Sequence, residues 1–168
     1  MKSRLVVITL ALVAMFLMNI GEISADELRN MEVIIITGNK LSQYMMDATP
    51  VDEIFVYAYD ASTVTWHQIP WQIDELDDNK VGYYFGTKNG IFEGNEELLF
   101  IAQDAGDYAS PSDWIDDKDS RNYARYEYRV YDELDPAYIR YVYIYRSSTL
   151  QIDPNLPSYM AYDDSPSG

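Results

Sequence analysis

The stretch Tyr123–Arg146, which reads YARYEYRVYDELDPAYIRYVYIYR, decides the fold class. Charged residues alternate with tyrosine or valine through residues 125–130, and a second alternation runs from Ile139 to Arg146. A period of two is typical of a β-strand, because successive side chains point to opposite faces. Between the two runs, Asp132–Pro136 combines turn-forming residues with a proline that ends a strand ladder. The sequence therefore predicts a long antiparallel hairpin.

Four earlier runs have the same strand-like character. They are short, rich in β-branched and aromatic residues, and separated by Asp, Asn, Gly, Pro and Ser. The runs are Glu32–Thr37, Glu53–Tyr59, Val64–Ile73 and Glu97–Gln103. Helical signals are limited to single turns at Leu41–Met46 and Pro111–Trp114. Strands that follow one another without helices favour antiparallel sheets. We therefore predict an all-β fold, an antiparallel β-sandwich of the jelly-roll or immunoglobulin-like kind.

The first 25 residues have the order of a secretory signal peptide. Lys2 and Arg4 precede an apolar run of 16 residues, Leu5–Ile20, and a small residue, Ala25, stands at the expected cut. The run is shorter than the roughly 18 to 20 residues that cross a bilayer as a helix. An uncleaved anchor is the alternative, because Ile23 is an unusual residue three before the cut. We expect a secreted or cell-surface protein with no stable membrane insertion after cleavage.

The remaining residues fit one domain. Residues 26–168 number 143, which suffices for one core and not for two. We predict a β-sandwich domain over residues 26–146, and a linker or the start of a missing C-terminal region over residues 147–168. The chain has no cysteine, so neither a disulfide nor a lipid-modified cysteine can form.

The chain is strongly acidic. The net charge is −16, and residues 1–25 contribute +1 through Lys2, Arg4 and Glu22, which leaves −17 on the rest. Such a field repels nucleic acid and anionic lipid, so we expect no nucleic-acid partner. It fits either a solvated exported surface or cation binding.

The most specific stretch lies between Gln68 and Asp107. It reads QIPWQIDE over residues 68–75 and NGIFEGNEELLFIAQDAGD over residues 89–107. These motifs resemble the pattern I-P-x-Q-I-D-E followed by N-G-x-x-D-G-N-D-E-L-x-F-x-A-x-D-x-G-D. That pattern belongs to an uncharacterised β-rich N-terminal domain of large exported bacterial and archaeal proteins, some of which are tied to polysaccharide processing. The resemblance spans roughly Pro50 to Arg146.

The resemblance implies an abbreviated calcium loop. The matching positions are Asn89, Glu93, Asn95, Glu96 and Glu97. This chain has Glu93 and Glu96 where the family has aspartate, which lengthens two of the implied ligands by a methylene. Calcium takes six to eight oxygen ligands, and a glycine serves where the loop turns sharply. A full EF-hand template fails, because Phe85 and Thr87 fall where acids should stand.

Two readings of this loop stay open. A calcium site between two strands could draw further oxygens from the preceding connection, which holds Asp74, Glu75, Asp77 and Asp78. A plain acidic turn is the other reading, because Asn-Gly is a strong hairpin signal without any ion.

Aromatic residues suggest a second kind of site. Trp66, Trp71 and Trp114 accompany 16 tyrosines, and exposed aromatic faces bind sugar rings. The alternative is that these rings fill the sandwich interior and form cross-strand pairs.

Catalytic signatures are weak. His67 is the one histidine and there is no cysteine, which excludes thiol catalysis and the usual zinc sites. Adjacent acids such as Asp74 with Glu75, or Glu96 with Glu97, point to opposite faces of a strand, so neither pair can act as a hydrolytic couple. A catalytic couple would have to combine acids of different segments. The sequence predicts a non-catalytic exported accessory or interaction domain at the front of a larger cell-surface or secreted protein. Calcium is the candidate ion, and a glycan or a cell-surface protein is the candidate partner. The alternative is a polysaccharide-active enzyme or its carbohydrate-binding part.

Overall fold

The structure is a computed structural model that describes residues 31–42, 48–76, 89–94 and 96–157. The described residues all belong to one compact unit. The predicted signal peptide and Asn95 lie outside the described residues. Within the described part of the chain, no helix is long and apolar enough to span a membrane.

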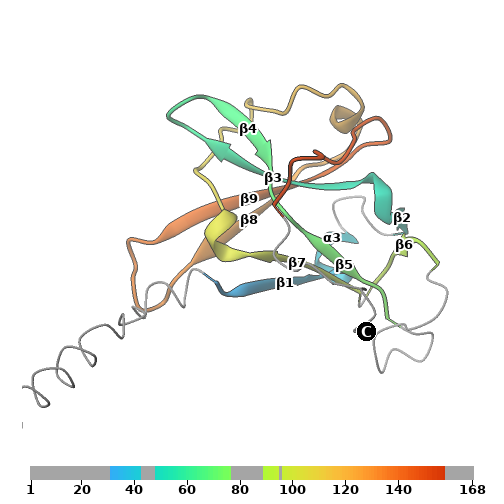
Figure 1. The fold of residues 1–168 in the computed structure, drawn as a ribbon, viewed down its shortest axis with the longest axis horizontal. Helices are drawn as coiled ribbons and strands as arrows, with labels where there is room; N and C mark the ends of the chain where they lie inside the picture. The colour runs from blue at the N-terminus through green and yellow to red at the C-terminus, as the bar shows by residue number, and fades with distance from the viewer. Residues whose placement is uncertain (1–30, 43–47, 77–88, 95, 158–168) are drawn as a thin grey trace, which may run out of the picture. The chain divides into compact units, whose positions relative to one another are not determined.

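Two antiparallel sheets carry the fold, as predicted (Figure 1). The larger sheet has the order β4-β3-β9-β8, formed by Thr65–Gln68, Ile54–Asp60, Ile139–Arg146 and Tyr126–Tyr131. The smaller sheet has the order β1-β7-β5, formed by Val33–Thr37, Glu97–Ile101 and Gln72–Asp74. A two-stranded ribbon joins β2 (Thr49–Pro50) to β6 (Ile91–Phe92). The prediction of an all-β antiparallel sandwich is confirmed at this level.

The helical elements of the described residues are short. They are α3 (Gly38–Leu41) and the 3-10 turns η2 (Val51–Glu53), η3 (Ala102–Asp104) and η4 (Asp119–Asn122). The turn predicted at Leu41–Met46 begins earlier, at Gly38, and residues 43–46 lie outside the described residues. The turn predicted at Pro111–Trp114 is not helical, and a 3-10 turn follows it at η4.

The long hairpin is confirmed. Strands β8 and β9 pair antiparallel from Tyr126 opposite Ile144 to Tyr131 opposite Ile139. The prediction of one strand over Val64–Ile73 is wrong. The chain leaves the larger sheet after Gln68 and enters the smaller sheet at Gln72. Pro70 lies in the crossing and has no N–H to donate, so a continuous ladder cannot pass through it.

The aliphatic core lies between the two sheets. Alternate residues of β3 and β9 point into it, and the inner face of the smaller sheet closes it from the other side. Its buried members include Ile54, Val56, Ala58, Val142, Ile144, Ile36, Leu98 and Phe100. This packing explains why β1 and β7 have lower exposure at every second residue.

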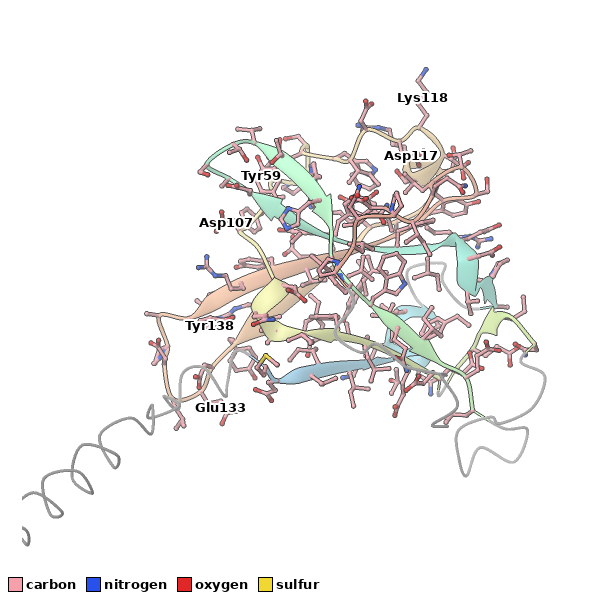
Figure 2. The ribbon with its side chains drawn as sticks, in the orientation of Figure 1. Tyr59, Asp107, Asp117, Lys118, Glu133 and Tyr138 are labelled. Carbon is pink, nitrogen blue, oxygen red and sulfur yellow. The ribbon has the colours of Figure 1, made fainter. Side chains whose placement is uncertain are left out.

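An aromatic cluster covers the opposite face of the larger sheet. The intervening residues of β3 and β9 supply Phe55, Tyr57, Tyr59, Tyr143 and Tyr145, and Ala109, Ile115 and Leu150 pack over them. Strand β3 and residues 142–145 of β9 are therefore buried on both faces, although the cover contains no β-strand. A hydrogen-bonded aspartate, Asp117 (labelled in Figure 2), holds the cover in place. Its carboxylate accepts hydrogen bonds from the Ser120 N–H at 2.7 Å and the Thr149 hydroxyl at 2.8 Å.

The turn at Gly106 and Asp107 joins this cover to the larger sheet. Gly106 exchanges two backbone hydrogen bonds with Tyr141, each 2.9 Å long. The next residue, Asp107, donates its N–H to the Tyr59 carbonyl at 2.7 Å, and both residues are labelled in Figure 2. The Asp107 carboxylate accepts the Ala61 N–H and pairs with Arg140, both at 3.0 Å. These contacts give the Gly-Asp end of the motif a structural role.

Candidate functional site: an acidic turn, an aromatic cluster and an apolar groove

The predicted calcium loop begins as a backbone turn. Gly90 adopts a φ of 73°, a left-handed conformation that glycine tolerates without steric cost. Its N–H donates to the carboxylate of the buried Glu75 at 3.0 Å, and its carbonyl accepts the Val51 N–H at 3.0 Å. Asn89 is exposed, and its side-chain carbonyl accepts the Ile91 N–H at 2.8 Å. Asn89 therefore caps the turn that leads into β6.

The second half of the loop closes on itself. Glu96 is buried, and its carboxylate accepts the Glu93 N–H at 2.7 Å, while the Glu96 N–H returns to the Glu93 carbonyl at 2.9 Å. The Glu93 side chain is exposed, and Glu97 lies in β7. The turn packs against α3, since a Cβ on Gly38 would lie 2.5 Å from the Glu93 carbonyl oxygen.

This geometry gives the acidic turn a role that needs no ion. The Glu96 carboxylate accepts a backbone N–H of its own turn, which closes the turn without a ligand. Among the described residues, no group of three or more His, Cys, Asp or Glu side chains is placed to hold a metal. Asn95, the fifth predicted ligand, lies outside the described residues. The calcium site therefore stays a prediction.

Two of the predicted sugar-binding tryptophans belong to the aromatic cluster. Trp66 packs against Tyr59, Tyr143 and Tyr145 with ring centroids 4.9 to 5.8 Å apart. Trp114 packs edge-on against Tyr145 at 5.3 Å. Its indole N–H donates to the Ser120 hydroxyl at 2.9 Å. Both indoles are half-buried, so their faces serve packing rather than an open platform.

Arg125 joins these rings, and sequence reasoning missed it. Its side chain is 7% exposed, and its guanidinium donates to the Asp113 carbonyl at 2.7 Å. The guanidinium lies over the rings of Tyr143, Trp114 and Trp66 at 4.7, 5.4 and 5.9 Å. In the sequence, Arg125 is only one of the charged residues of the strand alternation. Its side chain is buried because the 108–123 segment covers that face of the sheet.

Burial in this cluster changes the acidity of its tyrosines. Desolvation raises the pKa of Tyr143 to about 12, although Arg125 lowers it in part. The Tyr143 hydroxyl accepts the Ala109 N–H at 2.6 Å. Desolvation also raises the pKa of Tyr145 and of Tyr57 above the ordinary value. These rings are part of a dry interior.

Trp71 lies at an apolar groove. The groove has a volume of about 980 Å³ and is lined mainly by hydrocarbon. Its walls come from β1, β5, β7, the segment that contains η2, and the tail after β9. The lining includes Val33, Trp71, Leu99, Ile101, Ile152 and Leu156, with Asp52, Gln72 and Glu75 as its polar members. Of the three predicted ligand-binding tryptophans, the structure places Trp71 at this groove.

The tail that forms one wall is fixed to the domain. Gln68 donates to the Gln151 carbonyl at 2.8 Å and accepts the Asp153 N–H at 2.9 Å. Residues 147–157, which sequence composition assigned to a linker, therefore help to form the groove. Ile152 and Leu156 are scattered among turn residues, so the sequence shows no periodic pattern that could have revealed this role.

Comparison with known proteins found no matching family model, no matching curated protein and no matching solved structure. The resemblance of residues 68–107 to the exported β-rich domain accordingly stays a prediction. The site must be interpreted from its own geometry. An apolar groove with a few carboxylate and amide groups can bind an apolar surface and orient it through hydrogen bonds.

Proposed function

We propose that this chain is an exported, non-catalytic interaction domain that binds its partner through the apolar groove. Residues 1–25 direct export and are removed after Ala25, and the domain works at the front of a larger cell-surface or secreted protein. The observation that supports binding is the groove itself. Its volume of about 980 Å³ lies in the range of ligand sites, and its lining is mainly hydrocarbon.

The burial pattern supports an apolar partner over a sugar at the other two tryptophans. Trp66 and Trp114 pack on tyrosines and on Arg125, which occupies the ring faces that a sugar would need. By contrast, Ile101 and Leu99 are half-buried within the groove, and Ile152 is exposed on its wall. Covering such side chains stabilises a complex by about 25 cal/mol per Å² of apolar area removed from water.

Glycan binding at Trp71 is the second candidate. This ring lines the groove together with Gln72 and Asp52, whose side chains can hydrogen-bond sugar hydroxyls. Trp71 also packs against Phe55 with ring centroids 5.9 Å apart, which holds the indole in place. A held indole beside polar groups is suited to stacking on one sugar ring.

Two assays separate the candidates. Nile red, a neutral apolar dye, is titrated against residues 26–168, because an anionic dye would be repelled by the charge of −17 that follows from the composition. Saturable binding that is lost in Ile101→Gln and kept in Ile139→Gln supports the apolar groove. Ile139 is the matched control because it is a strand isoleucine outside the groove.

Affinity electrophoresis in gels that contain soluble polysaccharides tests the second candidate. Retardation that Trp71→Ala removes, without any Nile red binding, would favour the glycan reading. If the wild-type chain neither binds Nile red nor is retarded by a polysaccharide, the groove is not a binding site. Export is tested separately by the mass of the secreted protein, which should begin at Asp26.

A further inference from the structure

Among the described residues, one backbone edge of the smaller sheet, that of β1, has no paired strand. The Glu32 carbonyl accepts the Ala102 N–H at 2.8 Å, and the Gly38 N–H donates to the Glu96 carbonyl at 2.9 Å. In an antiparallel ladder, every second residue turns its N–H and C=O toward the paired strand. The backbone groups of Val33, Ile35 and Thr37 therefore point away from β7. No described strand pairs with this edge of β1, which is the outermost strand of its sheet (Figure 1).

The face beside this edge is apolar. Val33 lies opposite Ile101, and Ile35 lies opposite Leu99, so four aliphatic side chains share the outer face. Val33 is 51% exposed and Ile35 is 46% exposed. The other face of the same strands is in the inter-sheet core. A sheet that is apolar on both faces is the pattern of a sheet covered on both sides.

The edge lacks the features that prevent strand addition. Natural edge strands carry lysine or proline, or twist away at a bulge. Residues 33–37 read VIIIT and contain no lysine, proline or glycine. The register with β7 is continuous from Val33 to Thr37 without a bulge. A β-branched edge of this kind, without a bulge or a lysine, is a template for another strand.

Charge around the edge defines the partner. Glu32 precedes the strand, and Asp52 lines the groove. At the other end of β1, Glu97 of β7 lies opposite Thr37 on the outer face, and Asp74 lies beyond it on β5. Lys40, in α3, is the cation that follows β1. Acidic groups thus flank the apolar face at both of its ends.

We propose that β1, at the margin of the groove, binds an extended segment of another protein, which adds as a strand to the smaller sheet. The segment alternates aliphatic residues, which cover Val33 and Ile35, and carries lysine or arginine at its ends, which meet the flanking carboxylates. This inference rests on the proposed interaction function and names its partner class. Main-chain hydrogen bonds to β1 supply affinity, and the alternate side chains that cover Val33 and Ile35 supply specificity.

A second copy of this chain fits the edge less well. The whole chain carries a net charge of −16 and residues 1–25 carry +1, so each copy carries −17 after their removal. Two copies would therefore repel each other. Long-range repulsion of that size slows association and weakens it at low salt. A cationic segment experiences the opposite field.

The experiment uses residues 26–168 and two capped peptides, Lys-Val-Thr-Val-Thr-Val-Lys and Glu-Val-Thr-Val-Thr-Val-Glu, in isothermal titration calorimetry. The lysine peptide is expected to bind at least about tenfold more tightly than the glutamate peptide. Ile35→Lys should weaken the lysine peptide by about tenfold or more, because it adds like charge and protects the edge. Ile139→Lys is the matched control and should bind as the wild type does.

The outcomes distinguish the inference from the proposed function. Nile red binding without peptide binding would overturn the strand-addition inference and leave the groove intact. Loss of both would overturn the inference and the proposed function together. Equal affinity for both peptides would overturn the charge argument. A dimer that sedimentation reveals in the wild type and not in Ile35→Lys would replace the foreign segment with a second copy.

Discussion

Replacing Gly106 by alanine tests how the cover is joined to the larger sheet. A Cβ at this position would lie 2.3 Å from the Tyr59 carbonyl oxygen and 2.8 Å from the Tyr59 nitrogen. Both atoms belong to the backbone of β3, so the segment must move away by about 1 Å to reach ordinary van der Waals contact. That movement disrupts the paired hydrogen bonds with Tyr141 and the Asp107–Tyr59 hydrogen bond.

The magnitude follows from two costs. Overpacking in a close contact costs about 1 to 3 kcal/mol, and each lost hydrogen bond adds about 1 kcal/mol. Because three hydrogen bonds are disrupted, we expect Gly106→Ala to lower the free energy of unfolding by about 4 to 6 kcal/mol, which for a domain of this size lowers Tm by roughly 13 to 20 °C.

Thermal unfolding followed by circular dichroism measures this effect, with two other glycines as controls. Gly94→Ala should stay within about 0.5 kcal/mol of the wild type, because its Cβ would meet only the Asn39 side chain, at 3.4 Å. Gly90→Ala should lose about 1 kcal/mol, because its φ of 73° strains any L residue although the space is open. A Gly106→Ala Tm within about 3 °C of the wild type, which is roughly the effect of 1 kcal/mol, would refute the reasoning.

Three further predictions concern the loop after β3, the buried tyrosines and the acidic turn. Val64 holds a φ of 58° and is 71% exposed, so Val64→Gly should raise the free energy of unfolding by about 1 kcal/mol in urea titrations. Burial raises the pKa of Tyr143 to about 12 in the folded chain from its ordinary value of 10.0, so the unfolded chain releases the hydroxyl proton at lower pH. The contribution of this group to the free energy of unfolding is therefore complete below pH 10. It falls between pH 10 and 12 by at most about 1.4 kcal/mol per pH unit. In Tyr143→Phe the free energy of unfolding should fall less steeply between pH 10 and 12. The same slope as in the wild type would count against this role of Tyr143. If calcium binds the acidic turn, millimolar calcium raises the wild-type Tm and does not raise that of the double variant Glu93→Gln and Glu96→Gln.

The strands of the hairpin were predictable because their alternation is long. Residues 125–130 and 139–146 repeat with period two over enough residues to exclude a helix. The prediction of one strand over Val64–Ile73 was wrong because it followed the apolar composition of the run and gave too little weight to Pro70. Ribbon strands β2 and β6 have two residues each, and so short a segment carries no period.

The burial of the aromatic residues was not predictable from local pattern. Residues 108–123 contain no strand, yet they cover one face of the larger sheet and bury Trp66, Trp114 and Arg125. The sequence of β9 marks the two faces, since Val142 and Ile144 alternate with tyrosines. That alternation separates an aliphatic face from an aromatic face, and it cannot say whether the aromatic face meets solvent or a covering loop.

The groove is formed by tertiary contacts, so it could not be predicted from the sequence. Leu99 and Ile101 occupy alternate positions of β7, which predicts that they share a face. The approach of Ile152 and Leu156 to that face follows from the hydrogen bonds between Gln68 and the tail, which join residues more than 80 positions apart.

The most direct test of the account is a map of backbone amide shifts on residues 26–168 when the lysine-flanked peptide is added. The account predicts that the largest shifts fall on Val33, Ile35 and Thr37, with slower amide exchange at the same three residues. It further predicts smaller shifts at Leu99 and Ile101. Shifts that centre on Trp66 and Trp114, or a spectrum that the peptide leaves unchanged, would contradict it.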